Sequence, residues 1–146
     1  MQYVTILSVL FSLCLVGCGE DEKATEVKKD VADYDYSTDS SVYSGEMKRY
    51  WLVLLKKGTA RNQDSIEIAR IQAAHMNNIN RLAREGKIIL AGPMGHDGDL
   101  RGIFILDCKD SAEVEQIVST DSAVISGRLK MEYYPWWSEK GKYILK

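Results

Sequence analysis

The side chains best suited to acid–base chemistry are a histidine and an aspartate far apart in the sequence. His75 shares a stripe with Ile71, Ile79 and Leu82, which recur at steps of three and four residues, so we expect it on the inner face of a helix. A buried histidine beside a carboxylate can act as a general acid or base. A lone histidine on an apolar face can also simply fill the core with one hydrogen bond. The sequence leaves both roles open for His75.

Asp121 follows the second predicted helix, in the segment Ser-Thr-Asp-Ser at residues 119–122. An aspartate here often serves as a turn or cap residue. Its functional role would be to hold the tautomer of His75 and to stabilise the protonated ring, as carboxylates do for catalytic histidines. Only the fold can bring the two side chains together.

A glycine-rich turn holds the other polar candidates. His96, Asp97 and Asp99 resemble metal ligands, but these residue types also favour turns, so we expect a turn and no metal. Gly92 and Pro93 are predicted to shape the backbone at the edge of a substrate-binding pocket. The segment lacks the spacing of a phosphate-binding loop, which argues against a nucleotide, and we expect no cofactor.

Cys108 has no basic neighbour in the sequence beyond Lys109, so a buried inert thiol is the simplest interpretation. Trp136 and Trp137 could stack on an aromatic ligand or anchor the end of a strand against a second copy of the chain. We favour the second role, because large amphipathic rings are common at interfaces.

Residues 1–17 contain no charged side chain. The apolar run 4–16 is shorter than the roughly 20 residues that span a membrane, but it fits the apolar core of a secretion signal. Leu-Val-Gly before Cys18 resembles a lipobox, although no Lys or Arg precedes the run. The pattern predicts a lipoprotein, lipidated at Cys18 and anchored in the cell envelope, at the outer membrane facing the periplasm if the host is Gram-negative. A buried N-terminal helix is the alternative, but such helices are usually amphipathic.

Charge divides the rest of the chain. Residues 19–46 hold nine acidic residues and three lysines with few aliphatic side chains, so residues 18–46 are predicted to form a flexible tether behind the lipidated cysteine. Residues 47–146 hold sixteen Lys and Arg against twelve Asp and Glu, a domain of ordinary size. This excess is too mild, and too scattered, to indicate a nucleic-acid partner.

The domain alternates strand and helix patterns. Strands are predicted at 49–55, 87–91, 101–106 and 129–134, and helices at 64–84 and 111–118, with Gly86 ending the first. The order β-α-β-β-α-β indicates an α+β fold of the ferredoxin-like type with an antiparallel sheet.

The predicted strands are apolar on both faces. Two helices can cover only one face of the sheet, so we expect a second copy to cover the other in a sheet-to-sheet homodimer. In the first strand Tyr50, Leu52 and Leu54 lie opposite Trp51, Val53 and Leu55. In the third strand Phe104 and Leu106 lie opposite Ile103 and Ile105 in the same way.

From Met47 to about Lys140 the sequence resembles the YciI-like (YCII-related) domain family of the dimeric α/β-barrel group. The resemblance rests on His75 in the first helix, Leu82 to Gly86 leading into Ile-Leu-Ala-Gly-Pro at 89–93, Gly102, and Asp121 with Gly127 before a strand ending in Pro-Trp at 135–136. It implies the dimeric α/β-barrel fold and a pocket pair formed by His75 and Asp121. The family usually has Asp-Pro where this chain has Asp121-Ser122. Many members have no established reaction, and the wider group includes small-molecule isomerases, monooxygenases and dehalogenation-type lyases.

Two functions are consistent with these residues. The first is a membrane-tethered domain that binds a small organic molecule in a pocket containing the His75–Asp121 pair. The alternative is a cofactor-free isomerase or lyase in which His75 is the general acid or base. Whether the chain is an enzyme is left open by its sequence.

Overall fold

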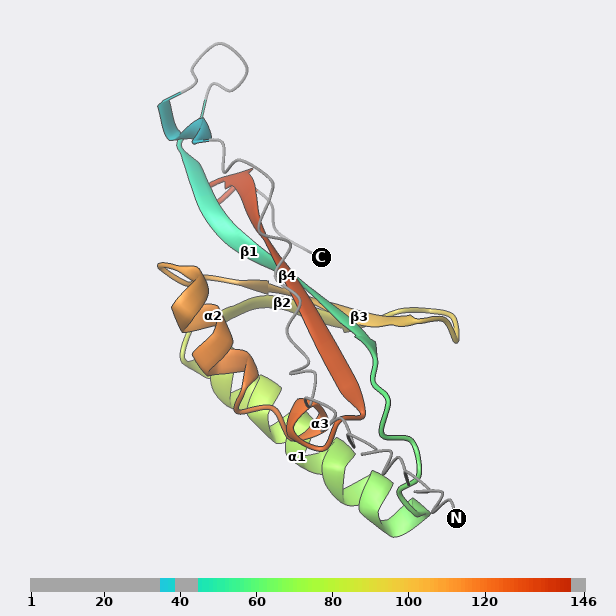
Figure 1. The fold of residues 1–146 in the computed structure, drawn as a ribbon. Coiled ribbons are helices and arrows are strands. Elements are labelled where there is room, and N and C mark those ends of the chain that lie inside the picture. The colour runs from blue at the N-terminus through green and yellow to red at the C-terminus, as the bar shows by residue number, and fades with distance from the viewer. Residues whose placement is uncertain (1–34, 39–44, 143–146) are drawn as a thin grey trace, which may run out of the picture.

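The computed structural model describes residues 35–38 and 45–142. These residues form a four-stranded antiparallel sheet in the order β2-β3-β1-β4 (Figure 1). The elements, in chain order, are η1 (Tyr36–Thr38), β1 (Met47–Lys57), α1 (Ser65–Arg84), β2 (Ile88–Pro93), β3 (Leu100–Leu106), α2 (Ser111–Val118), α3 (Ser122–Ile125) and β4 (Leu129–Glu139). The predicted ferredoxin-like β-α-β-β-α-β arrangement is confirmed, with α3 as an additional short helix.

The main differences from the sequence prediction concern prolines. β4 continues through Pro135 to Glu139, although its predicted end is residue 134. β2 likewise includes Pro93, which was predicted to lie in the turn. Both strands are at the edges of the sheet, where a missing N–H removes no central ladder bond.

Side chains and backbone set the limits of the helices. The carboxylate of Asp64 accepts the N–H of Glu67 at 2.8 Å and caps α1, and Gly86, at φ 72°, ends it as predicted. α2 is capped by Asp110, one residue before the predicted start at Ser111. Its side chain accepts the N–H of Glu113 at 2.9 Å.

All three helices lie on the same side of the sheet (Figure 1). The strand side chains that face the helices form the core together with inward-facing helix side chains. Four of these core residues are almost fully buried: Val53, Leu106 and Met131 from the strands and Val114 from α2. Burial of this face supplies the main driving force for folding.

The opposite face of the sheet carries no helix. Leu52 pairs with Ile105 and Leu54 with Ile103, and these side chains remain only half-buried. An ion pair between Lys56 and Glu132, with Nζ and Oε1 2.7 Å apart, lies at one end of this face. The face is therefore mainly apolar, with a charged margin.

Part of the predicted tether contacts the domain. η1 lies against β1, and the ring of Tyr36 meets that of Trp137 edge-on, with centroids 6.1 Å apart. The signal segment and Cys18 fall outside the described residues. Among the helices of the described part, none combines the length and apolar character needed to cross a lipid bilayer.

Candidate functional site

The fold brings His75 and Asp121 into direct contact. Nδ1 of His75, on α1, lies 2.7 Å from Oδ2 of Asp121, which precedes α3. Both residues are buried, with 8% and 3% of their surfaces exposed. A carboxylate at this distance accepts the Nδ1 proton, so the neutral ring keeps an unprotonated Nε2.

Asp121 uses its two oxygens for different purposes. Oδ1 accepts the N–H of Ala123 at 2.9 Å and caps α3, while Oδ2 holds His75. The cap role and the orienting role that the sequence left as alternatives therefore occur together in one side chain. Because the cap fixes the carboxylate, the imidazole is held against a rigid partner.

Polar contacts between α1 and the segment that contains Asp121 keep the pair in register. The hydroxyl of Ser122 donates to the carbonyl of Ile71 at 2.9 Å. Asn78 donates to the hydroxyl of Thr120 at 3.2 Å. Ser122, where the resemblance expects proline, thus ties α3 to α1 through its side chain.

His75 lines a pocket of about 360 Å³ between α1 and one end of the sheet. The imidazole stacks on Phe104 of β3, with centroids 6.3 Å apart and an interplanar angle of 26°. Aliphatic side chains from β1, α1 and β4 complete an apolar lining: Leu55, Ile71 and Leu129. The volume lies at the small end of the range for ligand pockets.

The second ring nitrogen of His75, Nε2, is neither hydrogen-bonded to the described residues nor fully shielded from solvent. A histidine that lines a pocket with one nitrogen fixed and the other accessible can bind a polar group or accept a proton there.

Gly92 and Pro93 also line this pocket, at the end of β2. They pair with Ile103 and Gly102 of β3. A side chain at Gly102 would place its Cβ 2.7 Å from the carbonyl oxygen of Gly92, so only glycine lets the two strands approach this closely. The structure therefore places His75, Gly92 and Pro93 at one pocket, with Asp121 directly behind His75.

The other candidates do not line this pocket. The carboxylate of Asp97 is paired with Arg101. Among the described residues, no group of three or more His, Cys, Asp or Glu side chains is arranged to hold a metal ion. Trp136 packs against Tyr50 at the far end of β1 and β4, and 41% of the residue is exposed. It is therefore remote from His75.

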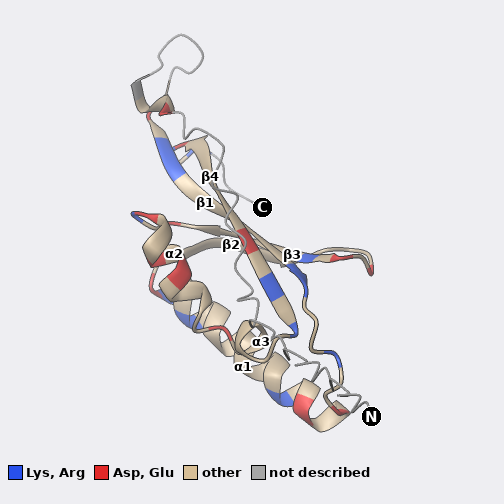
Figure 2. Ribbon diagram, in the orientation of Figure 1, with Lys and Arg blue, Asp and Glu red and all other residues tan. Residues whose placement is uncertain are grey.

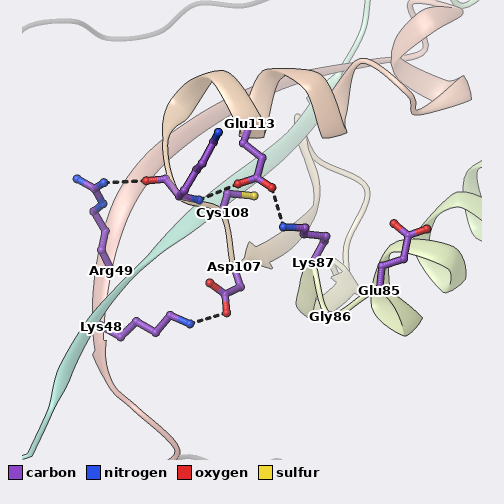
Figure 3. Close-up of a pocket in the computed structure, with 9 residues that line it drawn as sticks. Lys48, Arg49, Glu85, Gly86, Lys87, Asp107, Cys108 and Glu113 are labelled. Carbon is purple, nitrogen blue, oxygen red and sulfur yellow. Dashed lines mark hydrogen bonds and ion pairs between the residues drawn. The ribbon is translucent and has the colours of Figure 1, made fainter.

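A second, more open pocket lies beside Cys108 (Figure 3). Two ion pairs lie among its lining residues: Lys48 with Asp107 at 2.5 Å and Lys87 with Glu113 at 2.6 Å. Burial raises the pKa of the Cys108 thiol to about 11, so the reactive thiolate is scarce at neutral pH. This agrees with the predicted inert thiol.

Sequence reasoning missed three arginines that line the His75 pocket: Arg61, Arg101 and Arg128. They come from the loop after β1, the start of β3 and the residue before β4. No local motif links them, because it is the antiparallel pairing of the strands that brings these positions to one end of the sheet.

The fold and site define an α+β ferredoxin-like protein with a buried His–Asp pair at a pocket. The family model of the YCII-related domain matches residues 51–137, and the chain belongs to this family. This confirms the family resemblance drawn from the sequence.

Among solved structures, the chain is similar to 5-chloro-2-hydroxyhydroquinone dehydrochlorinase (TftG) from Burkholderia phenoliruptrix AC1100, in complex with 2,5-dihydroxybenzoquinone. The two are 21% identical, with a TM-score of 0.45, and the match covers 59% of this chain and 92% of that one. None of the curated proteins compared with the chain matches it.

Proposed function

We propose that this YCII-related domain binds a small organic molecule in the pocket beside His75, with Asp121 orienting the imidazole. The observation that carries the proposal is the 2.7 Å contact between Nδ1 of His75 and Oδ2 of Asp121, which fixes the ring with Nε2 accessible. The apolar lining around Phe104 suits a carbon skeleton, and the imidazole supplies a directional polar contact.

The second candidate function is a cofactor-free isomerase or lyase that uses the same pair. Nε2 of neutral His75 would take a proton from the substrate, and the carboxylate of Asp121 would stabilise the imidazolium until the proton is returned. The observation that favours this chemistry is the hydrogen bond on Nδ1, because it leaves Nε2 as the basic nitrogen.

Extraction of the purified chain followed by mass spectrometry tests the binding proposal. A defined small molecule should accompany the wild type and be lost from Gln72→Trp, because Gln72 is an exposed residue of α1 at the pocket. Asn77→Trp, on an exposed part of α1 away from the pocket, is the matched control. Equal recovery of the molecule from both variants would contradict the proposal.

His75→Gln separates the two functions. Glutamine keeps hydrogen-bonding capacity but cannot shuttle a proton at neutral pH. If the cellular role survives His75→Gln while Gln72→Trp abolishes it, the enzyme hypothesis fails and the binding function stands. Loss of the role in both variants, with the molecule still bound to His75→Gln, supports acid–base catalysis.

The helix-free face of the sheet supports a second element of the proposal, a homodimer. Leu52, Leu54, Ile103 and Ile105 form a contiguous half-buried apolar surface that the helices do not cover. A second copy packed sheet to sheet would remove this surface from water.

The N-terminal pattern supports membrane attachment through Cys18. A lipid on this cysteine would hold the domain near the membrane of the cell envelope, with the residues between Cys18 and η1 as the tether. Two lipid anchors per dimer would strengthen the attachment. Radiolabelled palmitate should enter the wild type and not Cys18→Ala, and equal labelling of both would contradict the anchor.

A further inference from the structure

The described residues that line the His75 pocket include three arginines and no aspartate or glutamate. Figure 2 shows basic segments in the loop after β1 and near the starts of β3 and β4, with acidic segments in the turn before β3. The pocket therefore combines an apolar floor with a positively charged margin.

Backbone contacts hold two of the arginines side by side. The loop after β1 is joined to the segment before β4 by hydrogen bonds from Gly58 N–H to the Arg128 carbonyl at 2.8 Å and from Ala60 N–H to the Gly127 carbonyl at 3.0 Å. The guanidinium of Arg61 then donates to the same Arg128 carbonyl at 3.2 Å. The two arginines thus stand on backbone that is fixed relative to the pocket.

Arg61 and Arg128 differ from Arg101 in having no ion-pair partner among the described residues. Arg101 is paired with Asp97. Arg128 donates only to the side-chain carbonyl of Gln63, at 3.1 Å. A guanidinium has five N–H donors, so each of the two keeps donors for a ligand.

The electrostatic influence of this group is visible at its edge. The pKa of Asp97 is lowered from its ordinary value, first by the hydrogen bond from Arg101 and then by the charge of Lys57, with a smaller contribution from Arg61. A ligand group that enters the pocket lies among the arginines that line it and beside the apolar side chain of Phe104.

We infer that the ligand of this pocket is a small organic carboxylate, with its carboxylate bound by Arg61 and Arg128 and its carbon skeleton packed against Phe104 beside His75. The inference rests on the proposed function and names its ligand class. Guanidinium groups match carboxylates with two parallel hydrogen bonds, and the apolar lining favours an organic anion over an inorganic one.

Equilibrium dialysis of the full chain tests this inference with radiolabelled benzoate as the probe and benzamide as its neutral counterpart. Wild type should bind benzoate at least tenfold more tightly than benzamide, because only benzoate gains charge-assisted hydrogen bonds. Arg61→Gln and Arg128→Gln should each weaken benzoate binding roughly tenfold and leave benzamide binding unchanged. Arg61 is exposed, so its substitution is not expected to disturb folding.

Arg84→Gln is the matched control, because Arg84 is an exposed arginine at the end of α1 that does not line the pocket. It should leave benzoate binding within about twofold of wild type. If all three variants lose affinity for benzoate equally, the loss reflects the net charge of the protein, and the inference is overturned. Inorganic phosphate should compete with radiolabelled benzoate less effectively than unlabelled benzoate does. Equal competition would overturn the preference for an organic anion.

Failure of this inference is distinguishable from failure of the proposed function. Equal binding of benzoate and benzamide overturns the inference that the ligand is a carboxylate, but it leaves the proposed binding pocket standing. If neither probe binds, the inference of a carboxylate ligand is also overturned. The proposed binding function then fails as well, unless a neutral molecule is extracted with the chain.

Discussion

His75 and Asp121 meet through Nδ1 and Oδ2 at 2.7 Å, and the second oxygen of the same carboxylate caps α3 through the N–H of Ala123. One aspartate therefore starts a helix and orients a histidine. The stability of α3 and the geometry of the site are coupled, because a change to the carboxylate affects both contacts.

Because Asp121 makes both contacts, Asp121→Ala should lower the free energy of unfolding by more than the loss of an ordinary helix cap. We expect a loss of about 2–4 kcal/mol in the free energy of unfolding, because the cap is removed and the buried Nδ1 of His75 loses its partner. Urea unfolding monitored by tryptophan fluorescence measures the change.

Asp110→Ala provides the comparison. Asp110 caps α2 in the same way, with its side chain half exposed and with no buried histidine attached to it. Its loss should cost about 1 kcal/mol. Equal costs for the two variants would show that the His75 contact adds nothing to stability.

Ser122→Pro should be tolerated by the backbone. Ser122 is the first residue of α3, where proline is favoured, and Asp121 has φ −79° and ψ 123°, which a following proline accepts. The proline variant loses the hydroxyl contact to Ile71, but proline also lowers the conformational entropy of the unfolded chain. Because these effects oppose each other, we expect a free energy of unfolding within about 1 kcal/mol of wild type.

Ser122→Ala loses the same hydroxyl contact without that gain. It should be destabilised by about 1 kcal/mol in the same urea experiment. A proline variant markedly less stable than the alanine variant would show that the backbone at Ser122 does not accept the ring.

If the proposed sheet-to-sheet dimer forms, one charged side chain placed in the open face of the sheet should prevent dimerisation. Leu54→Arg, in the middle of the open face, should convert residues 19–146 from dimer to monomer at micromolar concentration, measured by light scattering. Ile66→Arg is the control, because Ile66 is 81% exposed on α1 and should leave the dimer unchanged. A wild-type monomer at that concentration would contradict the dimer.

Cys108 should react slowly and in a pH-dependent manner. With the pKa of its thiol raised to about 11 by burial, only about one thiol in a thousand is ionised at pH 8. Iodoacetamide labelling of residues 19–146, which contain no other cysteine, should be at least a hundredfold slower in the native than in the guanidinium-unfolded chain. The native rate should rise about tenfold per pH unit toward pH 11, and a native rate equal to the unfolded one would contradict the assignment.

The fold was predictable because its signals are local. The three- and four-residue spacing of Ile71, His75, Ile79 and Leu82 defines α1, and the apolar strands around it define the sheet. The length of β4 was not predictable from its proline, because the sheet edge that tolerates Pro135 is a property of strand order and not of the neighbouring residues.

The site was predictable only in part. His75 and Asp121 were found from residue type, position and family resemblance, but their contact depends on how α3 docks on α1. Arg61 and Arg128 gave no signal, because isolated arginines near strand ends are common on solvated surfaces. Their shared position becomes visible only when β1 and β4 pair.

The central claim is that His75 contributes an accessible Nε2 to a ligand pocket. Its most direct test is to measure which ring nitrogen of His75 carries the proton, in long-range hydrogen–nitrogen NMR spectra of residues 19–146. The structure predicts that the neutral ring carries its proton on Nδ1, and that the Nε2 signal shifts when Gln72→Trp covers the pocket, while Asn77→Trp leaves it in place. A proton on Nε2, or an Nε2 signal that responds to neither variant, would contradict a ligand-binding role for this histidine.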